Sequence, residues 1–341
     1  MLNKKNLVLA ISTGALALAS ISSAHATTLE DTKERGALRC GVSDGLPGFS
    51  APDDEGNWQG LDVDVCRAVA AAVLGDADAV EYVSLNAVER FTALQSGEVD
   101  VLSRNTTWTT TRDTTLGINF AGVSFYDGQG FMVSRDLGIS SASELDGAAI
   151  CIQAGTTTEL NLADYFRAND MQFDPIVFDT SEQTVGGYQA GRCDVLTSDT
   201  SQLAALRIQL DDPDASVILG DVISKEPLGP SVRQGDDEWF NIVKWSLFAL
   251  LNAEELGLNS DNVDEMMESE NPNIVRLLGQ DGNYGEGMGL EADWAYNIIS
   301  QVGNYGEIYD RNVGMDSPLQ IERAVNALWT EGGLQYAPPI R

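Results

Sequence analysis

The segments FTALQSGEVD (residues 91–100) and VGGYQAGRCD (residues 185–194) follow one plan. In each, a helical pattern ends in a small residue and a glycine, and an aspartate then opens a short apolar run. A glycine that ends a helix is common in any α/β protein, so each segment alone predicts only an ordinary helix-to-strand turn. The two segments lie at matching places in two α/β units, and together they indicate two related lobes.

Strand-like and helix-like stretches alternate on both sides of these segments. Strand-like runs lie at residues 38–42, 80–83, 99–102, 149–152, 176–178 and 194–197, with helical patterns between them. This alternation predicts two lobes, each a mainly parallel sheet flanked by helices. An amphipathic helix at 239–251 and a long, mostly helical C-terminal extension to Arg341 follow.

The first 26 residues have the pattern of a secretory signal peptide. Lys4 and Lys5 precede an apolar stretch at 7–19, and Ala24-His25-Ala26 is a small-x-small cleavage signal. An uncleaved anchor helix is the alternative, but the apolar stretch is short for a membrane span. We therefore expect an exported, periplasmic protein without an inserted membrane segment.

Charge and composition exclude several classes of function. The signal segment holds two of the 20 basic residues and none of the 52 acidic ones, so the remainder carries a formal net charge of −34. Nucleic acids and anionic lipids both attract positive charge, so neither is an expected partner. The acidic surface is most simply a solubilising one.

The single histidine, His25, falls within the signal segment. The rest of the chain therefore lacks the side chain needed for Ser-His-Asp and Cys-His catalysis and for His-ligated metal sites. Mechanisms that use carboxylates alone or a Ser-Lys pair remain open. We expect no cofactor and no bound metal.

Four cysteines remain, and four cysteines allow three pairings. Their spacing contains no Cys-x-x-Cys motif, and export favours disulfides. The early and middle positions predict the pairs Cys40–Cys66 and Cys151–Cys193. Four buried free thiols are the alternative.

Several motifs in order resemble the polar amino-acid-binding proteins of ABC importers, the extracellular solute-binding family 3. The stretches that carry this resemblance are LRCGV (38–42), GLDVD (60–64), ALQSGEVD (93–100), TTTR (109–112), QAGTT (153–157) and GRCDVLTSD (191–199). Three more stretches are similar to one branch, the general L-amino acid-binding proteins: RNTTW (104–108), LGINF (116–120) and DWAYN (293–297) with GNYGE (303–307).

The resemblance implies a two-lobed clamp of the type II periplasmic binding fold that closes around its ligand and docks on a membrane permease. It places lobe 1 at residues 27–132 with 232–341, and lobe 2 at 133–231. Two crossing hinge strands are expected near 130–133 and 228–232. The implied function is capture of free L-amino acids, not catalysis.

The resemblance also assigns the two charges that a zwitterionic ligand requires. Arg112 occupies the position that binds the ligand carboxylate, for which a planar guanidinium suits two parallel hydrogen bonds. Asp199, at the end of a predicted strand, occupies the position for the ammonium group. The alternatives are a surface arginine paired with Asp113, and an aspartate that caps the next helix.

Further candidates surround this pair. Thr156 and Thr157 head a predicted helix, where hydroxyl and backbone N–H groups can hold a carboxylate. Arg90 and Arg104 are additional cations that favour an acidic or amide side chain on the ligand, unless they form surface ion pairs. The remaining predicted ligand contacts are Asn105, Thr107, Ser43 and Leu46, and the last two stand where the family often has an acid and an aromatic residue.

Two other functions compete with transport. Exported cyclohexadienyl or arogenate dehydratases resemble these binding proteins in fold, but they need a free acid to protonate a leaving hydroxyl. No carboxylate among the predicted site residues is evidently free for that step. A receptor ectodomain would require a second membrane segment and a signalling domain, neither of which the sequence shows.

Overall fold

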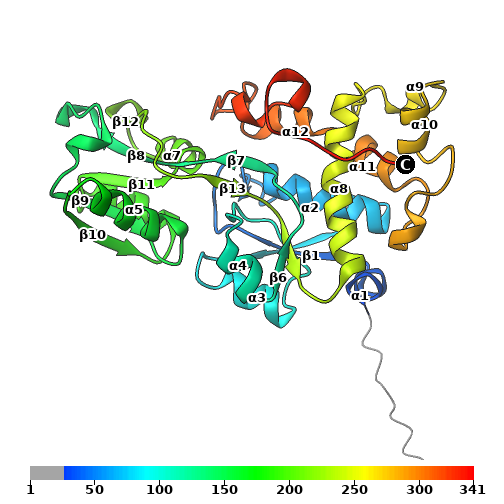
Figure 1. Cartoon of the computed structure of the whole chain (residues 1–341), viewed down its shortest axis with the longest axis horizontal. Coiled ribbons are helices and arrows are strands. Elements are labelled where there is room, and N and C mark those ends of the chain that lie inside the picture. The colour runs from blue at the N-terminus through cyan, green and yellow to red at the C-terminus, as the bar shows by residue number, and fades with distance from the viewer. Residues whose placement is uncertain (1–26) are drawn as a thin grey trace, which may run out of the picture.

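Two five-stranded sheets form the frame of the protein in a computed structural model that describes residues 27–341 (Figure 1). The predicted signal peptide lies outside the described residues. In the first sheet the strand order is β4-β1-β5-β14-β6, and β1 pairs in parallel with β4 and β5. Its strands are β1 (Leu38–Val42), β4 (Val80–Ser84), β5 (Val101–Leu102), β6 (Ile118–Phe120) and β14 (Ser231–Arg233), and its nearby helices are α1 (Thr28–Arg35), α2 (Leu61–Leu74), α3 (Arg90–Ser96) and α4 (Thr110–Thr115).

The second sheet has the strand order β10-β9-β11-β8-β12. The strands β10, β9 and β11 are parallel, whereas β8 is antiparallel to both of its neighbours, β11 and β12. The elements are β8 (Gln129–Ser134), β9 (Ala148–Gln153), β10 (Phe173–Phe178), β11 (Val195–Asp199) and β12 (Ser216–Ile218), with α5 (Thr157–Ala168), α6 (Ser181–Gln189) and α7 (Thr200–Arg207). The two predicted lobes with mainly parallel sheets are therefore confirmed.

Two antiparallel strands, β7 (Phe125–Asp127) and β13 (Glu226–Leu228), join the lobes (Figure 1). The prediction that the first crossing lies near 130–133 was wrong, because those residues belong to β8 in the second sheet. Phe131, Met132 and Val133 are fully buried there. A buried strand of a sheet and a crossing strand are both short apolar runs, so sequence periodicity does not separate them. The second crossing also begins slightly earlier than expected.

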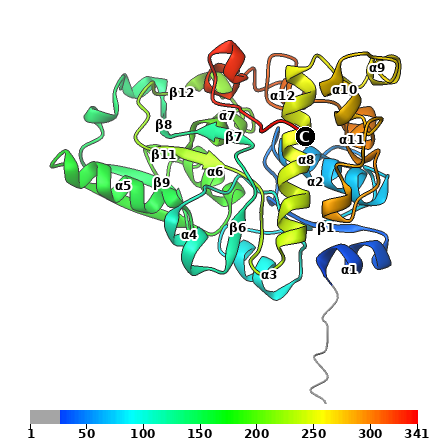
Figure 2. The same cartoon turned by 45° about the vertical axis from the view of Figure 1, so that its right-hand side comes forward.

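The C-terminal part of the chain packs on the first lobe. The long helix α8 (Asp237–Glu255) lies beside α2, and α11 (Trp294–Val302) packs on both of them (Figures 1 and 2). The other elements there are α9 (Val263–Met266), α10 (Pro272–Leu277) and α12 (Tyr305–Asn312). Among residues 27–341, no helix is long and apolar enough to cross a membrane.

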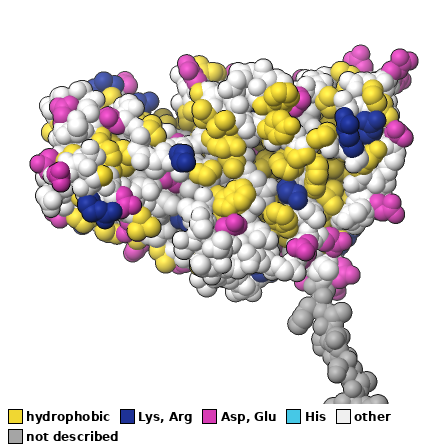
Figure 3. Space-filling view, viewed as in Figure 1, with side chains coloured by type: hydrophobic (Ala, Val, Ile, Leu, Met, Phe, Trp, Pro, Cys, Tyr) yellow, Lys and Arg dark blue, Asp and Glu magenta, His cyan; other side chains and the backbone are white. Residues whose placement is uncertain are grey.

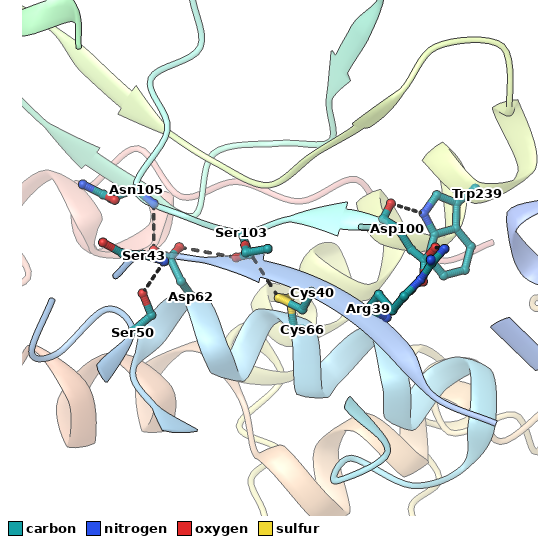
Figure 4. The surroundings of a disulfide bond; sticks show 11 residues. Arg39, Cys40, Ser43, Ser50, Asp62, Cys66, Asp100, Ser103, Asn105 and Trp239 are labelled. Carbon is teal, nitrogen blue, oxygen red and sulfur yellow. Dashed lines mark hydrogen bonds and ion pairs between the residues drawn. A yellow bond between two sulfur atoms is a disulfide. The ribbon is translucent and has the colours of Figure 1, made fainter. Parts of the chain in front are cut away.

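Both predicted disulfides are present. Cys40–Cys66 joins β1 to α2, with a sulfur–sulfur distance of 2.02 Å (Figure 4). Cys151–Cys193 joins β9 to the turn before β11. Each bond lies within one lobe, so neither covalently restrains the movement of one lobe against the other.

Acidic side chains lie mostly toward the edges of the face shown in Figure 3, and apolar side chains gather along α8. The exposed apolar residues of the C-terminal part include Trp329 and Tyr336, whose rings contact each other.

Candidate functional site

A cavity lies where the loops of the two sheets meet. It is lined by Arg90, Arg104, Asn105, Thr107, Gln153, Thr156, Thr157, Thr158, Ser198, Asp199 and Gln202. The first four belong to the first lobe and the others to the second. The cavity is therefore at the carboxyl ends of strands β5, β9 and β11, where open α/β sheets bind their ligands.

The turn after β5 presents Asn105 to the cavity in an unusual backbone conformation. Asn105 has φ +25°, which is costly for a residue other than glycine. Its backbone N–H donates to the Asp62 carboxylate at 2.7 Å, and the Ser103 hydroxyl donates to the same carboxylate at 3.4 Å (Figure 4). Burial raises the pKa of Asp62 to about 6. The start of α2 thus holds the strained turn in place.

Arg112 is placed by the short helix α4. The Thr109 hydroxyl accepts the Arg112 backbone N–H at that helix's first turn. The guanidinium donates to the Thr107 carbonyl oxygen at 2.9 Å and lies over the Phe91 ring. Burial lowers the pKa of Arg112, and the Glu226 and Asp199 carboxylates oppose that shift. Arg112 does not line the cavity itself, but it bonds to Thr107, which does, and its charge interacts with those of Glu226 and Asp199.

Two further arginines are almost fully buried, each with 3% of its surface exposed. Within residues 27–341, the Arg90 guanidinium makes two long hydrogen bonds, each 3.4 Å, to the Thr106 hydroxyl and to the Gly155 carbonyl oxygen, and it lies over the Phe91 ring. Its Nε has no hydrogen-bond partner among the described residues. Arg104 donates to the Leu85 carbonyl oxygen at 2.7 Å. Burial lowers the pKa of Arg104 to about 10 and that of Arg90 well below its ordinary value.

Asp199 faces these cations from the second lobe. It ends β11 and stands at the N-cap position of α7, yet within the described chain its carboxylate makes no capping hydrogen bond. Burial raises the pKa of Asp199 well above its ordinary value, and the nearby Asp127 and Glu226 carboxylates raise it further. A buried carboxylate without a capping bond is available to an incoming cation.

The turn from β9 into α5 brings the second lobe close to the first. Thr157, the first residue of α5, has its hydroxyl 3.4 Å from that of Thr107 and donates to the Glu226 carboxylate at 3.0 Å. Thr156 stands at the N-cap position but donates to the Gln153 carbonyl oxygen. Gly155 has φ +73°, and a Cβ there would lie 3.0 Å from the Val88 side chain. Only glycine permits this close approach without strain.

Two more polar contacts cross between the lobes, in addition to that of Arg90. The Asn105 amide donates to the Gln202 side chain at 3.1 Å, and the Ser181 hydroxyl donates to Asp44 at 3.4 Å. Arg90 reaches the Gly155 carbonyl, as described above. The carbonyl oxygen of the Asn105 side chain has no partner among residues 27–341. The cavity wall therefore retains an unused donor on Arg90 and an unused acceptor on Asn105.

Seven of the predicted ligand contacts line the cavity together, namely Arg90, Arg104, Asn105, Thr107, Thr156, Thr157 and Asp199. Ser43 and Leu46 do not line it. Ser43 is buried and its backbone N–H donates to the Ser50 hydroxyl, whereas Leu46 is fully buried in the core of the first lobe. Their role as ligand contacts stays a prediction.

Sequence reasoning missed Gln153, Thr158, Ser198, Gln202 and Glu226. Gln153 and Ser198 lie within the motifs QAGTT and GRCDVLTSD, Thr158 directly follows QAGTT, and Gln202 lies one helical turn after Asp199. Helical spacing is a signal that would have found Gln202. Glu226 comes from a crossing strand whose position the sequence did not reveal. Its buried carboxylate accepts from Thr157, Asn161 and Ser224.

Comparison with known proteins gives consistent matches. Residues 38–260 match the family described as bacterial extracellular solute-binding proteins, family 3. The chain is 59% identical to the general L-amino acid-binding periplasmic protein AapJ of Rhizobium johnstonii, over 99% of this chain and 100% of that protein. It is 53% identical to the glutamate/glutamine/aspartate/asparagine-binding protein BztA of Rhodobacter capsulatus, over 96% and 98% of the two chains. A solved periplasmic binding protein from Brucella ovis with glutathione bound superposes with a TM-score of 0.91 at 57% identity, covering 93% of this chain and 100% of that one.

Proposed function

This chain belongs to the bacterial extracellular solute-binding proteins, family 3, and we propose that it captures free L-amino acids in the periplasm and delivers them to the permease of an ABC importer. Relatives of more than half identity are named as amino-acid-binding proteins, and the name of AapJ places it in the periplasm. Two relatives from Escherichia coli, at 57% and 56% identity, are named putative amino-acid ABC transporter-binding proteins, so we propose no enzymatic activity, and the dehydratase alternative gains no support. Residues 1–26 would direct export and would be absent from the mature protein.

One observation carries the proposal: a buried carboxylate in one lobe faces buried guanidinium groups of the other across a cavity. Asp199 supplies the negative charge, and Arg112 with Arg90 and Arg104 supplies the positive charge. A zwitterionic amino acid needs this combination, because a charge is buried cheaply only when it is paired. We assign the ligand ammonium to Asp199 and the α-carboxylate to Arg112, with Thr107 and Thr157 beside it.

The remaining polar groups of the cavity would bind the side chain of the ligand. Arg90 has an unpaired Nε, and Arg104 is 4.0 Å from its nearest carboxylate, that of Asp44. Two buried and weakly paired cations favour a ligand with a second carboxylate or an amide oxygen. BztA is named for the binding of glutamate, glutamine, aspartate and asparagine, which supports this preference.

A γ-glutamyl peptide is a second candidate ligand, and the glutathione in the Brucella ovis protein favours it. The γ-glutamyl group of glutathione keeps a free ammonium and a free α-carboxylate. It therefore presents the same two charges to Asp199 and Arg112 as free glutamate does.

Calorimetric titration of ligand-stripped protein with the twenty common amino acids and with glutathione tests the proposal. We expect tight binding of several L-amino acids, led by those with acidic and amide side chains, and none of the corresponding decarboxylated amines. Binding of glutathione alone would replace the first candidate by the second. Binding of none of these compounds would refute the amino-acid assignment.

A further inference from the structure

We propose that the C-terminal extension (residues 261–341) braces the first crossing strand, and that Asn326 is the positioning residue through which it limits the separation of the two lobes. The extension lies beyond residues 38–260, the stretch that matches the family. It nevertheless contacts β7, one of the two strands that join the lobes.

Asn326 binds the backbone of Tyr126 in β7 at two points. The Tyr126 N–H donates to the Asn326 side-chain oxygen at 2.7 Å, and the Asn326 amide donates to the Tyr126 carbonyl oxygen at 3.0 Å. Since β7 belongs to a two-stranded sheet with β13, its other edge has no strand beside it within the described chain. The side chain of Asn326 takes the place of a neighbouring strand at that edge.

The extension holds Asn326 in place with several bonds of its own. Arg323 donates to the Asn326 backbone carbonyl oxygen and pairs with both carboxylate oxygens of Glu254 in α8, at 2.9 and 3.2 Å. Its guanidinium also lies over the rings of Tyr305 and Tyr309. The intervening Ala324 has φ +41°, a costly conformation that the flanking contacts maintain. Asn326 is therefore anchored to the helices of the first lobe.

The two residues before Tyr126 are held by the same part of the chain. The Tyr305 hydroxyl donates to the Ser124 carbonyl oxygen at 2.8 Å and accepts from the Gln335 amide. The Phe125 ring stacks on that of Tyr309, with centroids 5.8 Å apart. Three successive residues of the crossing segment are thus attached to the extension.

The next residue, Asp127, is attached to the second lobe instead. Its carboxylate accepts from the Thr200 hydroxyl at 2.6 Å and from the Ser201 backbone N–H at 3.2 Å. The attachment of the chain therefore changes from one lobe to the other between Tyr126 and Asp127. Rotation of the lobes must be absorbed at this junction, and the brace fixes its first-lobe side. Asp127 also neighbours the binding carboxylate Asp199.

Removal of the Asn326 side chain should loosen the junction. In Asn326→Ala we expect the ligand-free protein to be more expanded than the unaltered protein in X-ray scattering. We also expect L-glutamate to dissociate roughly tenfold faster, because two hydrogen bonds at the pivot are lost. The isosteric Asn326→Asp variant can still accept from the Tyr126 N–H but cannot donate to the Tyr126 carbonyl oxygen. It should show the same changes, and it replaces the alanine variant if that variant does not fold.

Gln301→Ala is the matched control. The Gln301 side chain also makes two amide–backbone bonds between the extension and the first lobe, to Ala77 and Gly75 on the turn after α2. We expect this variant to keep the dimensions of the unaltered protein and a dissociation rate within about twofold of it.

The proposal would be overturned if Asn326→Ala and Gln301→Ala lost the same melting temperature while Asn326→Ala kept the dimensions and the glutamate dissociation rate of the unaltered protein. The contact of Asn326 with β7 would then contribute to stability only. The dissociation measurement rests on the proposed function. The scattering measurement does not, because it uses the ligand-free protein. If glutamate fails to bind, scattering still tests whether Asn326 limits the separation of the lobes.

Discussion

Arg112 and Asp199 approach the cavity from different lobes, and each is buried enough for its charge to matter. Replacement of Arg112 by alanine should reduce the affinity for L-glutamate by about 2–5 kcal/mol, as expected when one partner of a buried charge pair is removed. Arg112→Lys should lose part of that amount, because an ammonium group lacks the planar fork. Calorimetric titration measures both changes.

Arg167→Ala serves as the control for this prediction, since Arg167 is largely exposed on α5 and forms an ion pair with Asp164 of the same helix. It should bind as the unaltered protein does. Unchanged affinity in a folded Arg112→Ala variant would remove Arg112 from the site.

Ligand binding should release protons from Asp199. Burial and the Asp127 and Glu226 carboxylates raise the pKa of Asp199 in the free protein, whereas a bound ammonium favours the ionised form and lowers it. Affinity should therefore rise with pH until Asp199 is ionised in the free protein. Titrations in buffers of different ionisation enthalpy measure the released protons.

Burial raises the pKa of Asp62 to about 6, so the ionisation of Asp62 also contributes to the dependence of affinity on pH. The variant Asp62→Asn separates the two contributions, because Asp199 should still release its proton in it. Affinity that does not rise as the pH is raised from acidic to neutral values would contradict the role of Asp199.

The buried pair Arg90 and Arg104 should set the preference for acidic ligands. Replacement of either by alanine should weaken the binding of L-glutamate more than that of L-leucine, because only glutamate offers a second carboxylate. Competition titrations with the two amino acids give the ratio of affinities. A glutamate preference that survives both substitutions would mean that these arginines have a structural role only.

At the residue scale, seven of the predicted site residues line one cavity, whereas Ser43 and Leu46 do not. Arg112 and Asp199 stand within ordered motifs, so the resemblance identified them. Leu46 was predicted from a loop position, but its apolar side chain is buried in the core of the first lobe. Glu226 carried no local signal, because its proximity to Thr157 depends on the path of the crossing strand.

The turn between β9 and α5 is the element that brings the lobes into contact. Gly155→Ala should weaken ligand binding, since the added Cβ would meet Val88 of the opposite lobe and the positive φ disfavours alanine. Gly147→Ala is the matched control: Gly147 has a similar φ of +79° just before β9, and a Cβ there meets nothing within 4 Å.

Both glycine variants should lose about 1 kcal/mol of stability from backbone strain in thermal unfolding. Only Gly155→Ala should also lose affinity. Equal binding by the two variants would show that contact at this turn does not contribute to ligand capture.

At the element scale, periodicity and turn residues predicted most helices and strands of both sheets. The β/α alternation fixes the central parallel strands because each apolar run is short and bounded by turn signals. The same signals did not give the positions of the crossing strands correctly. Residues 130–133 are a better apolar run than β7 itself, whose Tyr126 and Asp127 are only partly buried.

At the scale of the whole molecule, two lobes are connected by β7 and β13 and carry separate internal disulfides. Both cysteine pairs were predicted from their separation along the chain. The lobe limits at residues 133 and 231 stay a prediction, and strand pairing favours a first crossing a few residues earlier. The packing of the extension against β7 was beyond sequence reasoning, because it joins residues about 200 positions apart.

The central claim is that the cavity recognises both charges of a free α-amino acid. Calorimetric titration of ligand-stripped protein with L-glutamate, glutarate and 4-aminobutyrate tests it most directly, since glutarate lacks the ammonium and 4-aminobutyrate lacks the α-carboxylate. We predict tight binding of glutamate and at least about a hundredfold weaker binding of each analogue. Binding of either analogue as tight as that of glutamate would contradict the assignment of Asp199 or of Arg112, respectively.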